Sequence, residues 1–252
     1  MKMHRFFIKD TDISEVDGEF EINITDEVLL HQMKNVLRLS ENDHVIFLDQ
    51  SGNEYQSVLK KVMKKNLIFS KEIMKKNLKS NKVNFVLYPA VIKKDKLEYV
   101  LQKCTELGVT DFCPLVSDRT EKLNFNMKRT ETIIREAAEQ SEKNHLPSVS
   151  PPTSFSQLVE MHETGKVEFP GETSYYLDIE APLMDVSLMR EIIIKHENTF
   201  NFFVGPEGGW SDIDREMFKA INVKPVSLGN TVLRAETASI AIASLLLLGH
   251  SD

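Results

Sequence analysis

Residues 202–211, Phe-Phe-Val-Gly-Pro-Glu-Gly-Gly-Trp-Ser, join a short apolar run to the start of a helical pattern. Two adjacent glycines let the backbone turn sharply and approach a ligand closely, and Pro206 stiffens the turn. Ser211 or Asp212 can cap the following helix. The stretch contains neither a Lys-Ser/Thr pair nor GxGxxG, which disfavours a phosphate loop and a dinucleotide site. Alone, it indicates either a ligand-binding loop or an ordinary tight turn.

A second stretch of this kind, residues 228–238, reads Leu-Gly-Asn-Thr-Val-Leu-Arg-Ala-Glu-Thr-Ala. It also ends a strand pattern and opens an apolar helix, with Arg234 at the junction beside Glu236. An Arg–Glu pair at a helix start is usually structural, because the helix dipole favours the Glu. Two glycine-bearing loops with an arginine between them nevertheless predict a small-molecule pocket that opens onto an anionic or electron-rich substrate.

Strand and helix patterns alternate from about residue 81 onward. Strands are predicted over 83–91, 110–116, 174–177, 199–204 and 225–228, and helices over 97–107, 129–140, 183–195, 212–221 and 236–248. Gly108 is expected to end the first helix, and residues 145–171 are expected to be rich in loops. Such alternation predicts a parallel sheet with helices on both faces and ligands at the carboxyl ends of its strands. The loops at those ends are 178–181, 205–209 and 229–235.

The first 80 residues instead predict short strands over 20–24, 44–49, 55–62 and 67–73, with a hairpin signal at Gln50-Ser-Gly-Asn. Thr25 is expected to cap one short helix. Its apolar face is expected to hold Val28, Leu29, Met33, Val36 and Leu37. These elements predict a small β-barrel with one helix.

Composition and charge are those of a globular protein, with 41% hydrophobic residues, 27% charged residues and a net charge of −7. Within residues 60–103, 13 lysines accompany only three acidic residues. This excess can attract a phosphate backbone, although a solvated lysine-rich surface explains it as well. The longest apolar run is too short to span a bilayer, no secretion signal is recognisable, and Cys104 and Cys113 have no metal or redox spacing. We expect a cytoplasmic protein with no membrane contact and no metal.

The two glycine-bearing stretches closely resemble motifs of the SPOUT methyltransferases and, more narrowly, of the ribosomal RNA small subunit methyltransferase E family. Further matching blocks are Lys93-Lys-Asp-Lys, Gln102-Lys-Cys-Thr-Glu-Leu-Gly-Val, Ser117-Asp-Arg-Thr and Glu136-Ala-Ala-Glu-Gln-Ser. The family's PUA-like barrel is matched by Arg5-Phe-Phe, Val36-Leu-Arg-Leu, Gly52 and Tyr55. The resemblance runs through nearly the whole chain. It departs at Glu142-Lys143, where the family usually has Gly-Arg, and at His31, one place before the family's usual His.

The resemblance implies an α/β fold in which a PUA-like β-barrel RNA-binding domain, residues 1–75, precedes a trefoil-knotted SPOUT methyltransferase domain, residues 76–252. It implies a homodimer that methylates N3 of a uridine in the decoding region of 16S rRNA during small-subunit maturation, using S-adenosylmethionine. One alternative is a SPOUT enzyme acting on a ribose 2′-OH, which is disfavoured because its Asn-Pro-Gly-Asn-type block is absent. The other is a non-catalytic RNA-binding assembly factor, which is disfavoured by the intact glycines of both stretches.

The resemblance, the chemistry of the expected reaction and the lysine cluster together give individual residues expected roles. The cofactor is expected to bind Leu177, Val204, Gly205, Pro206, Glu207, Gly208, Gly209, Leu228, Gly229, Asn230, Val232, Leu233, Ala235 and Thr237. Arg234 is expected to stabilise the charge that spreads over the uracil carbonyls as N3 loses its proton, and Glu139 and Glu236 are candidate bases. RNA is expected to contact Arg5, Arg38, Lys60, Lys61, Lys64, Lys65, Lys93, Lys96 and Arg119. Arg119 is also the residue expected to reach the partner subunit's pocket.

Overall fold

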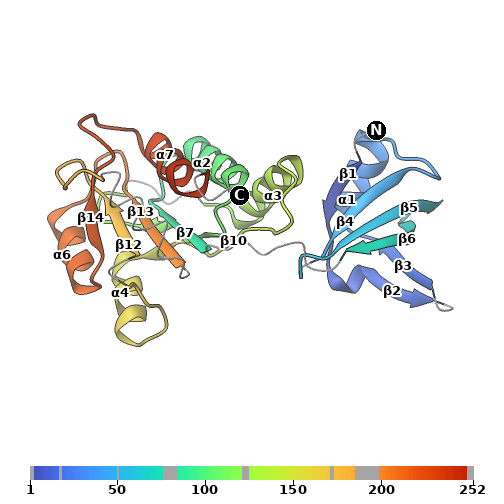
Figure 1. The fold of residues 1–252 in the computed structure, drawn as a ribbon, viewed down its shortest axis with the longest axis horizontal. Helices are drawn as coiled ribbons and strands as arrows, with labels where there is room; N and C mark the ends of the chain where they lie inside the picture. The colour runs from blue at the N-terminus through green and yellow to red at the C-terminus, as the bar shows by residue number, and fades with distance from the viewer. Residues whose placement is uncertain are drawn as a thin grey trace. The chain divides into compact units, whose positions relative to one another are not determined.

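The computed structural model describes residues 3–16, 19–49, 51–75, 84–120, 125–170, 173–184 and 199–248. Their elements gather into two compact units, each with its own apolar core (Figure 1). The first unit comprises Met1–Ser80 with Ala138–Leu146, and the second comprises Asn81–Ala137 with Pro147–Asp252.

A six-stranded sheet in the order β1-β4-β5-β6-β3-β2 forms the first unit. Its strands are β1 (His4–Phe7), β2 (Ile13–Val16), β3 (Glu19–Ile24), β4 (His44–Leu48), β5 (Glu54–Val62) and β6 (Leu67–Lys75). Only β1 and β4 pair in parallel among these neighbours. The unit also holds the turns η1 (Asp10–Asp12) and η2 (Gln32–Val36) and the helix α1 (Glu27–His31). The β4–β5 hairpin confirms the one that the sequence predicts.

Two details of the α1 region differ from the prediction. The residue that caps the helix is Asp26 rather than Thr25, and its Oδ1 accepts hydrogen bonds from the main-chain N–H groups of Val28 and Leu29, both at 3.0 Å. Val28 and Val36 are exposed instead of buried. Val36 lies in the π-helical turn η2, whose wider turn shifts the phase of the apolar face. Val28 lies in the first turn of α1, where the neighbouring Leu29 is the buried residue.

The segment 138–146 packs as part of the first unit. Ala138 shares a small apolar cluster with Phe7 and Leu48. The Arg5 guanidinium donates through Nη2 to the Asn144 Oδ1 atom, at 2.8 Å. The unit is therefore completed by residues that lie far along the chain from its strands.

The second unit is built on a fully parallel six-stranded sheet in the order β10-β8-β7-β13-β12-β14. Its strands are β7 (Asn84–Pro89), β8 (Asp111–Phe112), β10 (Ser148–Val149), β12 (Ser174–Leu177), β13 (Thr199–Val204) and β14 (Lys224–Val226). The helices are α2 (Lys94–Leu107), α3 (Met127–Gln140), α4 (Phe155–Glu163), α6 (Asp212–Ala220) and α7 (Ala235–Leu247). A separate short pair joins β9 (Leu115–Val116) to β11 (Thr153–Ser154).

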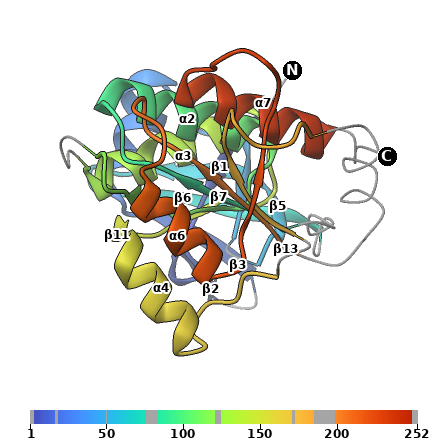
Figure 2. The ribbon, with the colours of Figure 1, turned by 90° about the vertical axis from the view of Figure 1, so that its left-hand side faces the viewer.

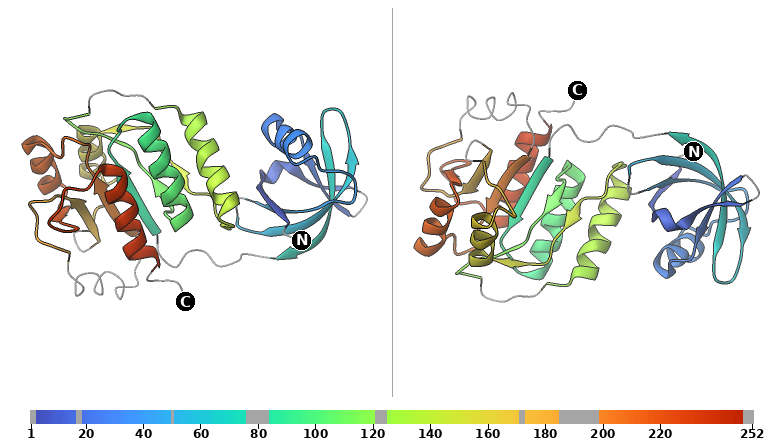
Figure 3. Two further views of the ribbon diagram at one scale, coloured as in Figure 1. Left: turned by 90° about the horizontal axis from the view of Figure 1, so that it is seen from above. Right: turned by 90° about the horizontal axis from the view of Figure 1, so that it is seen from below.

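Both faces of this sheet are covered by helices, as predicted. Successive residues of β13 point to opposite faces: Phe202 belongs to the core beneath α2 and α7, and Phe203 belongs to the core with Phe218 of α6. Figure 2 shows α2 and α7 on one side of the strands and α4 and α6 on the other. The helices α2 and α7 run side by side in both views of Figure 3.

Some elements differ from the sequence prediction. Helix α4 lies in a stretch that we expect to be loops, although Ser154 and Gln157 form a capping box at its start. The strand expected over 110–116 is two short strands, β8 and β9, because Pro114 interrupts it. Gly108 ends α2 with a φ of 111°, which confirms its predicted role. The helix expected over 183–195 lies almost wholly outside the described residues.

We predict that Ser211→Ala lowers the free energy of unfolding of the second unit by about 1 kcal/mol. The Ser211 Oγ atom accepts from the Asp214 N–H at 3.1 Å, and Asp214 Oδ2 accepts from the Ser211 N–H at 3.0 Å. The matched control is Ser239→Ala, since this hydroxyl is also buried but only donates back to the Ala235 carbonyl within α7. Urea unfolding followed by the fluorescence of the single tryptophan, Trp210, measures both. Equal losses in the two variants would contradict the capping role.

Candidate functional site

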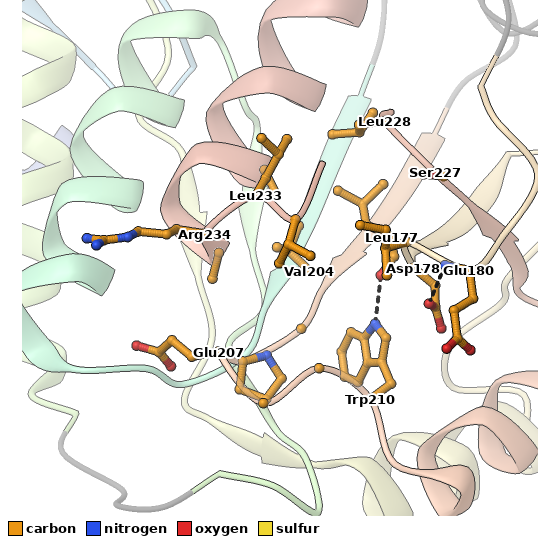
Figure 4. A pocket seen from close by; sticks show the side chains of 18 of the residues that line it. Leu177, Asp178, Glu180, Val204, Glu207, Trp210, Ser227, Leu228, Leu233 and Arg234 are labelled. Carbon is orange, nitrogen blue, oxygen red and sulfur yellow. Dashed lines mark hydrogen bonds between the residues drawn. The ribbon is translucent and has the colours of Figure 1, made fainter. Parts of the chain in front are cut away.

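The three loops predicted to carry a ligand do meet in space. They leave the carboxyl ends of the neighbouring strands β12, β13 and β14 and enclose a cavity of about 420 Å³ (Figure 4). This volume falls within the range of about 300–1,000 Å³ that small-molecule sites occupy. We refer to it as the loop cavity.

Trp210 fixes the relative position of two of these loops. Its indole Nε1 donates to the Leu177 carbonyl at the end of β12, at 3.0 Å, and the side chain is only 2% exposed. The ring packs so closely on Gly205 that a Cβ atom there would lie 3.1 Å from the Trp210 Cε2 atom. A Cβ atom at 205 would therefore need the indole to move by a few tenths of an ångström, which favours glycine there.

Glycines also shape the floor of the loop cavity. Gly209 has a φ of 68° and Gly229 a φ of 153°, conformations that residues with a Cβ rarely adopt. A Cβ atom at either position would meet no heavy atom within 4 Å, so both glycines border open space. At Gly208 the carbonyl accepts a hydrogen bond from Arg119 Nη1 of the same chain, at 2.5 Å. The remaining wall is apolar, with Val204, Leu228, Val232 and Leu233.

One edge of the loop cavity carries acidic side chains, and an arginine forms ion pairs with them. The Asp178 carboxylate accepts from the Arg215 Nε–H at 2.9 Å and from the Glu180 main-chain N–H at 3.1 Å. Arg215 also approaches Asp212 at 3.2 Å and Glu180 at 3.8 Å. The hydrogen bond to Asp178 is the main reason why the pKa of Arg215 is raised. Arg215 thus ties the loop after β12 to helix α6.

The opposite edge carries two ion pairs. Figure 4 shows Glu207 and Arg234 on this side and Asp178 and Glu180 on the other. Lys96 Nζ lies 2.9 Å from Glu207 Oε1, and this hydrogen bond lowers the pKa of Glu207 and raises that of Lys96.

The second pair joins Arg234 Nη1 to Glu236 Oε1 at 4.0 Å. The Arg234 side chain is 76% exposed and that of Glu236 is 15% exposed. The buried Glu236 Oε2 atom has no hydrogen-bond partner within the described ranges. Arg234 is the N-cap residue of α7, so its position at the cavity rim is set by the start of the helix.

Of the residues predicted to bind a cofactor, all but Asn230 and Thr237 line the loop cavity. The neighbours Thr231 and Ala238 line it instead. Helix α7 begins at Ala235, and residues three apart share a helix face, so Ala238 faces the cavity and Thr237 does not. Asp178, Ile179, Glu180 and Thr231 also line the cavity and lie in the predicted loops, although they were not among the named cofactor residues. The lining residues outside those loops that the sequence did not single out are Trp210, Arg215, Ser227 and Ala238.

The two candidate bases belong to different units. Glu236 follows the cavity-lining residues Arg234 and Ala235, whereas Glu139 belongs to the first unit and does not line the loop cavity. The Glu139 carboxylate is 8% exposed and accepts a hydrogen bond from the Phe7 main-chain N–H at 3.3 Å. Glu139 is thus absent from the lining of the loop cavity, and its role as a base stays a prediction.

Three residues expected to contact RNA form ion pairs or hydrogen bonds with other residues of the same chain. Arg5 is largely buried and pairs with Glu54 at 3.0 Å, Lys96 pairs with Glu207, and Arg119 contacts Gly208 of its own loop cavity. The others, Arg38, Lys60, Lys61, Lys64, Lys65 and Lys93, are exposed. Lys143 is half-buried, and this burial lowers its pKa.

Within the ranges that the structure describes, there is neither a metal-binding cluster nor a membrane-spanning helix. No cluster of three His, Cys, Asp or Glu residues there could hold a metal ion. No helix there is both long enough and apolar enough to cross a membrane.

Sequence comparisons connect this site to a family. Residues 79–247 match the model of the RNA methyltransferase domain, and residues 24–72 match that of the RNA methyltransferase PUA domain. The chain is 33% identical over 227 residues to the ribosomal RNA small subunit methyltransferase E of Synechocystis sp., covering 86% of this chain and 70% of that one.

Solved structures share the fold over nearly the whole chain. A putative methyltransferase from Legionella pneumophila, in complex with the bound cofactor SAM, superposes with a TM-score of 0.82 at 22% identity and covers 99% of this chain and 98% of that one. A ribosomal RNA small subunit methyltransferase E from Neisseria gonorrhoeae, bound to S-adenosyl methionine, gives 0.77 at 24% identity and 96% coverage of both chains. At these identities the structural similarity establishes the fold alone. The family is shown by the match to the domain model and by the Synechocystis relative. The chain belongs to the ribosomal RNA small subunit methyltransferase E family.

Proposed function

We propose that the chain transfers a methyl group from S-adenosylmethionine to N3 of a uridine in the decoding region of 16S rRNA. The observation that carries this proposal is the loop cavity, which three glycine-bearing or acidic loops enclose at the carboxyl ends of β12, β13 and β14 in a chain of this family. A non-catalytic assembly factor would have no use for that cavity, so this alternative function explains the site less well.

The residues of the loop cavity fit S-adenosylmethionine. Its apolar wall, with Val204 and Leu228, suits an adenine ring, and the open space beside Gly209 and Gly229 lets the backbone approach the ligand. The acidic edge with Glu180 suits a cationic ligand with hydroxyl groups. When bound, the cofactor supplies a methyl group on a sulfonium, which is already an activated electrophile.

On the substrate side, the work left to the protein is positioning and charge stabilisation. Loss of the N3 proton spreads negative charge over the uracil carbonyl oxygens. Arg234, at the exposed rim, supplies a cation for that charge, in the way that an oxyanion hole supplies donors. Glu236 holds Arg234 by their ion pair and is the base that we propose for the N3 proton. The uridine must be unpaired, because N3 is buried in a base pair.

Assembly and location extend the proposal. We propose a homodimer with a trefoil knot in the second unit, working in the cytoplasm, as the family resemblance implies. Exposed apolar side chains on the adjacent helices α2 and α7, and at the C-cap of α7, support a subunit contact there: Tyr99 is 48% exposed, Leu245 42% and Leu248 58%.

We predict that Gly208→Val abolishes S-adenosylmethionine binding and leaves the fold intact. A Cβ atom at 208 would lie 3.5 Å from Arg119 Cδ, an ordinary contact, so the added branches crowd the loop cavity rather than the core. Gly208→Ala is the graded control and should retain weaker binding. Titration calorimetry together with Trp210 fluorescence measures binding, and urea unfolding checks the fold. Unchanged affinity in Gly208→Val would show that the cofactor binds elsewhere.

We predict that Arg234→Ala lowers single-turnover methylation at saturating RNA on the order of 100-fold, the scale of losing one charge-stabilising donor, with near-normal RNA affinity. The control is Arg129→Ala, which removes another exposed arginine that faces a carboxylate, Glu98, but does not line the loop cavity. The role of Arg234 fails if both variants keep the wild-type rate.

We predict that the exposed lysines of the first unit contribute to RNA affinity, in contrast to Arg234, which contributes to the methylation rate. Converting Lys60, Lys61, Lys64 and Lys65 to Gln should weaken RNA binding and flatten its salt dependence, because fewer counterions are released. Turnover at saturating RNA should change little. The control converts the exposed Lys128, Lys166, Lys219 and Lys224 of the second unit. The same loss of affinity and salt slope in both sets would assign the effect to net charge alone.

A further inference from the structure

A second cavity lies within the first unit, and the proposed methyl transfer does not use it. Its volume is about 220 Å³, against about 420 Å³ for the loop cavity. Strand β1, the turn η2 and the last residues of α3 with those just after it form its wall, and all of these lining residues belong to the first unit. They include Arg5, Gln32, Leu37, Glu139 and Gln140. We call it the barrel cavity.

Blocks of sequence that are distant along the chain meet in the barrel cavity. Arg5-Phe-Phe contributes Arg5, Val36-Leu-Arg-Leu contributes Leu37, and Glu136-Ala-Ala-Glu-Gln-Ser contributes Glu139 and Gln140. None of these residues lines the loop cavity. The proposed methyl transfer therefore does not account for a cavity lined by these residues.

Charge excludes a phosphate as that ligand. Arg5 is the one guanidinium at the barrel cavity, and its Nη2 is already shared between Glu54 and Asn144, at 3.0 and 2.8 Å. The Glu139 and Glu142 carboxylates line the same cavity, so the cation does not leave an excess of positive charge. A neutral ligand that forms hydrogen bonds suits this environment better than an anion.

The side-chain amides point to the kind of neutral ligand. Among the described residues, the side chains of Gln32 and Gln140 make no hydrogen bond. Each offers a donor and an acceptor together, the combination with which Gln reads the edge of a base. Leu37 adds an apolar contact for a ring. Proteins that read RNA sequence mostly bind unpaired bases on such edges.

We propose that the barrel cavity binds one unpaired nucleobase of the RNA substrate, at a position other than the methylated uridine. The carboxylates favour a base that presents an exocyclic amino group, as adenine and cytosine do, over uracil with its two carbonyl oxygens. This proposal rests on the proposed RNA substrate and adds a point of sequence recognition to it.

The experiment uses labelled single-stranded RNA oligonucleotides of about six nucleotides and the full chain, with binding followed by fluorescence anisotropy. The probes carry adenine, cytosine, uracil, or no base on the same ribose-phosphate backbone. Wild-type protein should bind the adenine and cytosine probes more tightly than the uracil and abasic probes. Gln32→Ala combined with Gln140→Ala should weaken adenine and cytosine binding roughly tenfold, the loss of a good amide–base pair, and leave abasic binding unchanged. Gln56→Ala, another partly exposed glutamine of the first unit, is the matched control and should have no effect.

Several results overturn the proposal: equal wild-type affinity for adenine and abasic probes, an equal loss on both in the double variant, or no measurable binding of any probe. Trp210 fluorescence with S-adenosylmethionine and methylation of rRNA by the wild-type chain are measured alongside. If methylation succeeds while the base dependence is absent, only the barrel-cavity proposal fails. If methylation fails, the proposed function itself is at fault.

Discussion

The contact of Trp210 with Gly205 and with the Leu177 carbonyl is the constraint on which the site depends. The indole is buried, its N–H has one acceptor at 3.0 Å, and a Cβ atom at residue 205 would lie only 3.1 Å from the ring. The end of β12 and the loop after β13 are thereby held together, and Arg215 holds the next part of the β12 loop through Asp178. A cavity formed by three separate loops can then be organised before any ligand enters, which lowers the cost of ordering them on binding.

Apolar, acidic and basic side chains occupy different parts of the molecule. The loop cavity has glycines and apolar residues at its centre, carboxylates with Arg215 at one edge and the Arg234–Glu236 and Lys96–Glu207 pairs at the other. A cluster of exposed lysines, Lys60, Lys61, Lys64 and Lys65, lies instead on the first unit, around the β5–β6 turn. Screening over about 10 Å confines each group to its neighbourhood, so a chain of net charge −7 can still present a basic surface to RNA.

Local patterns explain what the sequence predicted well. Alternating residues in β13, the glycine that ends α2 and the loops after β12, β13 and β14 are all set within a few neighbouring residues. Glu139 shows what local patterns cannot predict. The sequence shows that it lies on a helix, but it does not show that the last turn of α3 belongs to the first unit. Asp178 and Arg215 lie 37 residues apart, and no local pattern pairs them. Helix α4 was predictable, because Ser154 and Gln157 carry the signature of a capping box, but the prolines before it favoured loops.

The identity of the methylated atom tests the central claim most directly. Small ribosomal subunits from a strain that lacks the gene are incubated with the purified chain and S-adenosylmethionine that carries an isotopically labelled methyl group. Their 16S rRNA is then digested to nucleosides and separated by chromatography with mass detection. The account predicts that the label appears in 3-methyluridine, at one position. Label in a 2′-O-methylated nucleoside, or no label in the 16S rRNA, would contradict it.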